Sequence, residues 1–149
     1  MPSRNVIRAY DINTYYHLYN RGVDKRKIFL DSQDYAVFLG LLKRYLDNKP
    51  NIDSKGREYN WLANEVEVVA FCLMPNHFHL LLYQIEMDAI TKLLRAVISS
   101  YATYFNVKYN RAGTLFQGCF KAVKVNNQSY LQYLTRYIHR NPPNYLNWE

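Results

Sequence analysis

The feature that most constrains the fold is a predicted pair of strands joined by a short turn in the middle of the chain. Residues 66–74 form a continuous apolar run rich in β-branched side chains, which is typical of a strand at the centre of a sheet. Pro75-Asn76 predicts a tight turn, and residues 77–83 predict a second strand that returns beside the first. The chain is therefore expected to be built around an antiparallel sheet.

The patterns on either side of this hairpin predict alternating strands and helices. In chain order, the expected elements are a strand at 15–20, a helix opening at 31–34, a loop at 47–64, the hairpin, a helix at 88–109, a strand at 120–125 and a last helix from Ser129 to Pro142-Pro143. Gln132 is in the capping-box position of that last helix. This order matches an α+β, ferredoxin-like split βαβ sandwich with one four-stranded antiparallel sheet. Helices would cover one face, the other would be open to a ligand, and an extra helix would follow. Residues 1–149 are expected to form a single domain.

Charge and aromatic content favour a nucleic-acid partner. Lys and Arg number 19 against 12 Asp and Glu, a net charge of +7, and aromatic side chains make up 16% of the chain. Single-stranded nucleic acid is bound by rings that stack on bases and by cations that follow the phosphates. A solvated basic surface and an aromatic core are the plainer explanation of the same numbers.

The cysteines and the apolar segments favour a cytoplasmic protein. Cys72 and Cys119 have no metal-binding spacing and are expected to be buried free thiols of a reducing compartment. Residues 1–8 do not resemble a signal segment, and no apolar run reaches the ~20 residues that a membrane span needs.

The strand at 77–83 begins with two histidines that point to a metal site. Alternate side chains of a strand share a face, so His77 and His79 are expected to lie side by side, roughly 7 Å apart. Two imidazoles at that spacing can reach one metal ion, although the pattern also occurs by chance on solvent-facing strands. A third ligand must come from elsewhere. His17, on a strand expected to neighbour this one, would orient a ligand or the phosphate, or would simply be a packed structural histidine.

The last predicted helix places a tyrosine and an amide on one face. Tyr137 and Asn141 are four residues apart, and the Asn141 oxygen suits a hard cation. A tyrosine hydroxyl, with a pKa of about 10, is a poor nucleophile unless it is activated. Beside a metal that polarises a phosphodiester, it could form a phosphotyrosine ester and later rejoin the strand without ATP. Tyr137 could equally belong to a packing stripe.

Basic side chains near these elements are candidates for phosphate contacts, although a solvated surface explains each of them equally well when it is taken alone. They are Arg21, Lys25, Arg26, Lys121, Lys124, Arg136 and Arg140.

Four segments resemble one known family over nearly the whole chain. They are Tyr16-His17-Leu18-Tyr19-Asn20-Arg21-Gly22, Cys72-Leu73-Met74-Pro75-Asn76-His77-Phe78-His79-Leu80-Leu81, Gly113-Thr114-Leu115-Phe116-Gln117 and Tyr137-Ile138-His139-Arg140-Asn141-Pro142. Together they resemble the HUH single-tyrosine transposases, both the REP-associated group and the insertion-sequence type.

The resemblance implies a metal-dependent transposase or endonuclease. It would cleave and rejoin hairpin-containing single-stranded DNA through a 5′-phosphotyrosine, with Mg²⁺ or Mn²⁺ as cofactor and a homodimer as the working form in insertion-sequence relatives. His77 and His79 would be metal ligands and Tyr137 the nucleophile, and Asn141 stands where those relatives have a metal-binding Gln. The relatives usually continue beyond the Asn-Pro with an arginine-bearing segment, whereas only residues 143–149 follow here. A non-catalytic single-strand-binding module, or an HUH replication initiator or relaxase, are the alternatives.

Overall fold

The computed structural model describes residues 9–140, and for residues 137–140 only the course of the backbone. Its sheet has four strands, β1 (Thr14–Arg21), β2 (Val66–Met74), β3 (His77–Gln84) and β4 (Lys121–Val125), in the order β2-β3-β1-β4. Every neighbouring pair is antiparallel. The three main helices are α1 (Ser32–Leu46), α2 (Ala89–Lys108) and α3 (Gln128–Arg140). The predicted ferredoxin-like fold is confirmed.

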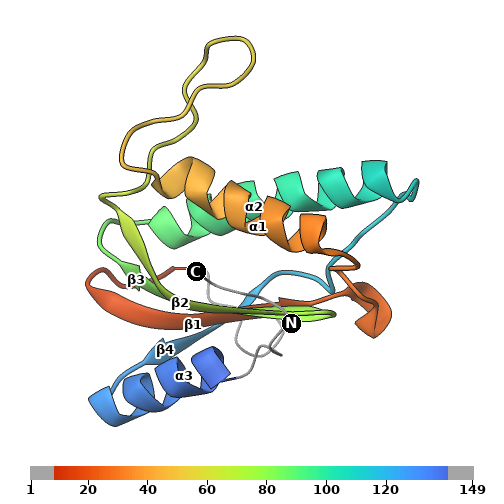
Figure 1. Ribbon diagram of the computed structural model, residues 1–149. Helices are drawn as coiled ribbons and strands as arrows, with labels where there is room; N and C mark the ends of the chain where they lie inside the picture. Colours follow the sequence, from red (N-terminus) through yellow and green to blue (C-terminus); the bar gives the residue numbers. More distant parts are fainter. Residues whose placement is uncertain (1–8, 141–149) are drawn as a thin grey trace.

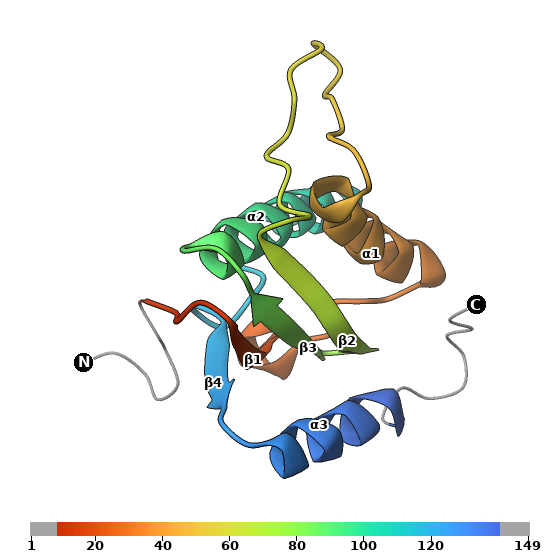
Figure 2. The same cartoon turned by 90° about the vertical axis from the view of Figure 1, so that its left-hand side faces the viewer.

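The helices lie on both faces of this sheet. Helices α1 and α2 cover one face, and α3 lies against the other (Figure 1). Seen from the side, the chain between α1 and β2 extends away from the sheet beyond the helices (Figure 2). None of the described helices combines the length and the apolar character that crossing a membrane requires.

The alternation of side chains along β3 separates the core from the second face. Phe78, Leu80 and Leu82 are fully buried in the main core beneath α1 and α2. Because successive residues of a strand point to opposite faces, His77 and His79 lie on the face that α3 approaches. The division predicted for this strand is therefore confirmed.

The second face is only partly open, because α3 has a small apolar core of its own there. Leu134 is 4% exposed and packs in a cluster with Ala70, Cys72, Leu81 and Val125. The sheet face over these residues is therefore covered, and the face left for a ligand lies toward the histidine end of β3.

Two local predictions were wrong. Asn127, not Ser129, caps the last helix, because its Oδ1 accepts a hydrogen bond of 2.7 Å from the amide of Tyr130. Cys119 is exposed rather than buried, since it lies in the loop before β4. Cys72 is buried as expected, and burial raises the pKa of its thiol to about 11.

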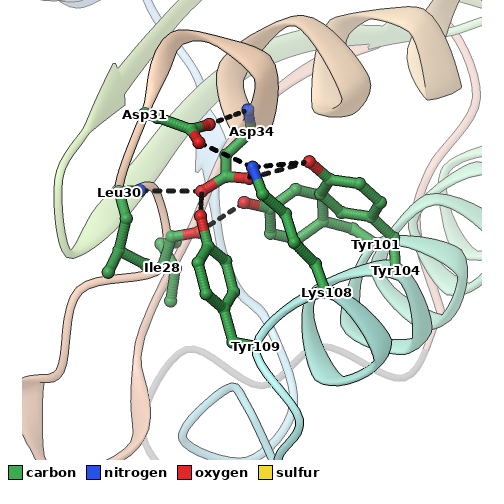
Figure 3. Close-up of polar contacts among 8 residues, drawn as sticks. All are labelled: Ile28, Leu30, Asp31, Asp34, Tyr101, Tyr104, Lys108 and Tyr109. Atoms are coloured by element: carbon green, nitrogen blue, oxygen red, sulfur yellow. Dashed lines mark hydrogen bonds and ion pairs between the residues drawn. The ribbon is translucent and has the colours of Figure 1, made fainter.

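A buried carboxylate links α1 to α2 on the far side of the core (Figure 3). Asp34 is fully buried and accepts four hydrogen bonds. Tyr104 and Lys108 donate to its Oδ1 at 2.8 and 2.9 Å, and the amide of Leu30 and the hydroxyl of Tyr109 donate to its Oδ2 at 2.9 and 2.6 Å. Every lone-pair direction of the carboxylate therefore has a donor.

Candidate functional site

Three histidine rings gather on the second face of the sheet. The ring centroids of His77 and His79 are 5.0 Å apart and the rings are nearly perpendicular, at 85°. The ring of His17, from β1, stacks on that of His79 at 5.1 Å and 27°. Nε2 of His17 lies 2.9 Å from Nδ1 of His79, which is a hydrogen bond. The strands thus bring together the predicted pair and a third imidazole.

The turn before β3 orients His77. Nδ1 of His77 lies 2.7 Å from Oδ1 of Asn76, and the Asn76 amide nitrogen points toward the carbonyl of Lys25 at 3.5 Å. An amide oxygen can only accept, so Nδ1 of His77 carries the hydrogen. Nε2 of His77 therefore has its lone pair available, which is the form of imidazole that binds a metal ion.

Burial keeps these imidazoles neutral. It lowers the pKa of His17 and of His77 below the ordinary value. For His79, burial and then the neighbouring His17 and His77 lower the pKa to about 4. At neutral pH all three rings are therefore in the uncharged state that metal coordination requires.

A basic pocket of about 470 Å³ opens beside the histidine pair. Its lining includes His77, His79 and three cationic side chains, Arg21, Lys25 and Lys121. Tyr19, Asn20, Asn76 and Gln117 are the other lining residues in the described part of the chain. The pocket thus combines two possible metal ligands with charges that suit a phosphate.

The segment before β4 shapes this pocket by pairing with the end of β1. Gly22 forms an isolated bridge with Phe116, and the amide of Gln117 donates to the carbonyl of Arg21 at 2.9 Å. Nε of Arg21 then donates to Oε1 of Gln117 at 3.0 Å. The backbone of Gly22 also lies close to that of Arg26. A Cβ at position 22 would be 2.2 Å from the carbonyl oxygen of Arg26, so only glycine fits there.

Among the remaining predicted phosphate contacts, Arg26, Lys124 and Arg136 do not line the pocket. The guanidinium of Arg26 lies over the Phe105 ring at 5.2 Å, and Nζ of Lys124 is 2.8 Å from Asp11. Arg136 is exposed on α3. Arg140 belongs to α3, but its side chain lies outside the described residues.

The two predicted residues of the last helix are only partly visible. Tyr137 is in α3, three residues after Leu134, and its side chain is outside the described part of the chain. Asn141 lies beyond the described residues altogether. Between residues 9 and 136, no three His, Cys, Asp or Glu side chains are grouped to hold a metal ion.

Asn76 and Gln117 are among the polar side chains of this site that sequence reasoning missed. A signal for both was present, because Asn76 directly precedes His77 and Gln117 ends one of the family-like motifs. Their roles depend on the turn geometry and on the Gly22–Phe116 bridge, which no spacing in the sequence reveals.

Comparisons with known proteins point to one class, DNA transposases. A family model described as "Transposase IS200 like" matches residues 58–141, more than half of the chain. The chain therefore belongs to the IS200-like transposase family, and its predicted kinship with the single-tyrosine transposases is confirmed. A comparison with curated proteins finds no match.

Two solved structures share the fold. A REP-associated tyrosine transposase bound to a REP hairpin is 14% identical, with a TM-score of 0.65 over 95% of this chain and 73% of its own. A candidate transposase from Deinococcus radiodurans R1 is 17% identical, with a TM-score of 0.52 over 95% of this chain and 98% of its own.

Proposed function

We propose that this transposase-family protein cleaves and rejoins single-stranded DNA through a 5′-phosphotyrosine, with Tyr137 as nucleophile and a divalent metal ion, Mg²⁺ or Mn²⁺, as cofactor. His77 and His79 would hold the metal, with the amide oxygen of Asn141 as a third ligand. The observation that carries the proposal is the neutral histidine pair beside a pocket lined by Arg21, Lys25 and Lys121.

The histidine pair fits a metal ion by its donor chemistry. The lone pair of His77 lies on Nε2, because Nδ1 is bonded to Asn76. Nδ1 of His79 is engaged with His17, so His79 would bind through Nε2 as well. Imidazole nitrogens suit Mn²⁺ better than Mg²⁺, which takes oxygen ligands. When bound, the ion would polarise the scissile phosphate.

The chain's own residues would supply the nucleophile and the phosphate contacts. The Tyr137 oxygen would attack phosphorus and lose its proton to solvent, the bond to the 3′ oxygen would break, and that oxygen would take up a proton. The reverse attack by a 3′-OH would rejoin the strand and release the tyrosine. The place of Tyr137 in α3, three residues after Leu134, supports this assignment, since Leu134 packs on the sheet face that also bears the histidines.

A hairpin-containing single strand is the proposed substrate. Two observations support this substrate. The chain belongs to a transposase family, and it shares the fold of a protein that is bound to a REP hairpin. A homodimer is proposed as the working form, on the family resemblance alone. Arg21, Lys25 and Lys121 would contact phosphates at the cleavage site, and Arg26, Arg136 and Arg140 would contact strands farther away. Lys124 is instead paired with Asp11, which occupies its charge.

A covalent-adduct assay tests the proposal. The full chain would be incubated with a 5′- or 3′-labelled hairpin oligonucleotide and Mg²⁺ or Mn²⁺, and the products separated on a denaturing gel. We expect an adduct with the 3′-labelled fragment, none with EDTA, and none with Tyr137→Phe. Tyr133→Phe, a change of the same kind one turn earlier in α3, is the matched control and should form the adduct normally.

Other outcomes would each exclude a part of the proposal. An adduct that persists in Tyr137→Phe excludes this nucleophile, and cleavage without an adduct indicates a hydrolytic nuclease. Binding without cleavage of any hairpin favours a non-catalytic module. An adduct that forms only at a plasmid-type origin would indicate a replication initiator or relaxase.

A further inference from the structure

We infer that His17 is a positioning residue that holds the imidazole of His79 in the tautomer and orientation needed for metal binding. This inference rests on the proposed function, in which His77 and His79 are the metal ligands. It assigns a role to a residue of β1 that neither contacts the proposed metal nor lines the basic pocket.

Strand pairing places His17 within reach of His79. In the register of β1 and β3, Tyr19 is opposite His79 and His17 is opposite Leu81. His17 and His79 are therefore diagonal neighbours on one face, a position from which long side chains can meet. The His17 ring also lies 5.3 Å from the Tyr19 ring, and the residue is only 9% exposed. Its packing leaves the ring little freedom to turn away.

The chemistry of imidazole links this contact to metal binding. A neutral imidazole that binds a metal through Nε2 carries its hydrogen on Nδ1. Nδ1 of His79 lies 2.9 Å from Nε2 of His17, so that hydrogen is donated to His17. If His17 instead donated to His79, the hydrogen of His79 would be on Nε2, and that nitrogen could not bind a metal. The direction of this one hydrogen bond therefore decides whether His79 is a ligand.

The two proposed ligands are oriented by partners of different kinds. His77 donates to the amide oxygen of Asn76, which can only accept, so its tautomer does not change. His79 faces another imidazole, which can accept or donate according to its own tautomer. Nε2 of His77 would thus be able to bind a metal ion at all times, whereas Nε2 of His79 would be able to do so when His17 carries its hydrogen on Nδ1.

Metal binding to the chain of residues 1–149 tests the role of His17 without relying on DNA cleavage. Mn²⁺ would be titrated in and the free ion followed by electron paramagnetic resonance. His17→Phe keeps a flat ring in place but removes the acceptor, and we expect it to weaken Mn²⁺ binding about 10- to 100-fold, as loss of such a partner does elsewhere. His17→Gln supplies an amide oxygen as acceptor and should restore binding to within a few-fold.

Tyr15→Phe is the matched control, since Tyr15 is on the same strand and the same sheet face, with its ring packed on Tyr83 rather than on a histidine. Its affinity for Mn²⁺ should equal that of the wild type. Circular dichroism of each variant would show that the fold is kept.

Nitrogen-15 spectra of the histidine rings give a direct second measurement on the unaltered chain. In the wild type loaded with diamagnetic Mg²⁺, we expect hydrogen on Nδ1 of both His79 and His17. Hydrogen on Nε2 of either ring would overturn the inference. Because this measurement uses the wild type, it remains decisive even when His17→Phe does not fold.

The outcomes distinguish the inference from the proposed function. A wild-type protein that binds no Mn²⁺ contradicts the proposed metal site itself. Wild-type binding that is unchanged in His17→Phe overturns the role of His17 alone. Equal loss in folded His17→Phe and His17→Gln would overturn it too, because an acceptor would then not be what His79 needs.

Discussion

The molecule has two polar clusters on opposite sides of its sheet, and they are built differently. Around Asp34, a buried negative charge is surrounded by donors from Leu30, Tyr104, Lys108 and Tyr109. In the other cluster, His17, His77 and His79 place like groups side by side, and His17 and His77 add to the effect of burial in lowering the pKa of His79.

The two clusters respond to burial in opposite ways. Burial alone would raise the pKa of Asp34, but hydrogen bonds from Tyr109, Lys108, Leu30 and Tyr104 outweigh it and lower the pKa to about 2. For the three histidines, burial is the main cause of the shift, and it lowers their pKa values because it disfavours the charged imidazolium. The Asp34 cluster pairs a negative charge with donors, which stabilises the fold, whereas the histidine cluster offers lone pairs that the proposed metal ion would use. The difference predicts that one cluster affects stability and the other activity.

The largest expected effect is on activity, at the histidine cluster. His77→Ala should reduce the rate of adduct formation by ~10³-fold. The reason is that the proposed metal ion would stabilise the transition state by several kcal/mol, and this stabilisation is lost with its ligand. The melting temperature should stay close to that of the wild type. Single-turnover rates on a hairpin oligonucleotide measure the first quantity and calorimetry the second. A rate within tenfold of the wild type would remove His77 from the site.

The next largest effect is on stability, at the carboxylate. Asp34→Ala removes the acceptor for Leu30, Tyr104 and Tyr109, and should lower the free energy of unfolding by about 3 kcal/mol. Urea denaturation measures this, and the cleavage rate per folded molecule should not change. Asp11→Ala, which breaks the exposed pair with Lys124, is the control and should cost less than about 1 kcal/mol. If Asp34→Ala and Asp11→Ala lowered the free energy of unfolding equally, the Asp34 cluster would not be the stabilising one.

Acid should affect the two clusters at different pH values. The histidines have lowered pKa values in the folded protein, so below about pH 6.5 the unfolded chain binds protons that the folded chain does not. Stability of the metal-free protein should therefore fall on the order of 1 kcal/mol as pH drops from 7 to 5. The contribution of Asp34 is present above about pH 4 and is lost only as pH falls toward 2.

Urea midpoints at several pH values, with EDTA present, would separate these windows. His79→Gln has no ring to titrate and should flatten the slope between pH 7 and 5, while Asp34→Asn should leave that slope as it is. A wild-type midpoint that does not change between pH 7 and 5 would contradict the histidine contribution.

The smallest expected effect concerns the basic pocket. Arg21→Ala should weaken binding of single-stranded DNA several-fold and reduce the salt dependence of log Kd by about one unit of slope, the effect of one phosphate contact. Fluorescence anisotropy over a range of NaCl concentrations measures it. Lys124→Ala is the control, because the Lys124 side chain pairs with Asp11 outside the pocket. If Lys124→Ala reduced the salt dependence of log Kd as much as Arg21→Ala, the pocket would not be the preferred site of phosphate contact.

The sequence predicted the histidine pair because that pair depends on one strand only. Alternation along residues 77–79 is enough to place both rings on one face, and the apolar residues between and after them are enough to choose the buried face. The order of strands and helices followed from equally local patterns. Local periodicity was sufficient for these features.

The missed features depend on contacts between distant segments. The hydrogen bond of His17 to His79 requires the register of β1 against β3, and a shift by one residue would remove it. The Asp34 network joins the start of α1 to the end of α2, about 70 residues away. Cys119 was misplaced because its apolar neighbours belong to a loop. Tertiary packing determines these contacts and exposures, and they cannot be predicted from residue spacing along the sequence.

The sheet order also determines when the pocket can form during synthesis. Strand β1 pairs on one side with β3 and on the other with β4, whose residues follow on the order of 100 positions later. At ribosomal speeds these take on the order of ten seconds to be made, and until then one edge of β1 is unpaired. The histidines of β3 can fold against β1 during that interval, but Gln117 and Lys121 are not yet present. A nascent chain therefore has His77 and His79 in place before the full cationic wall of the pocket.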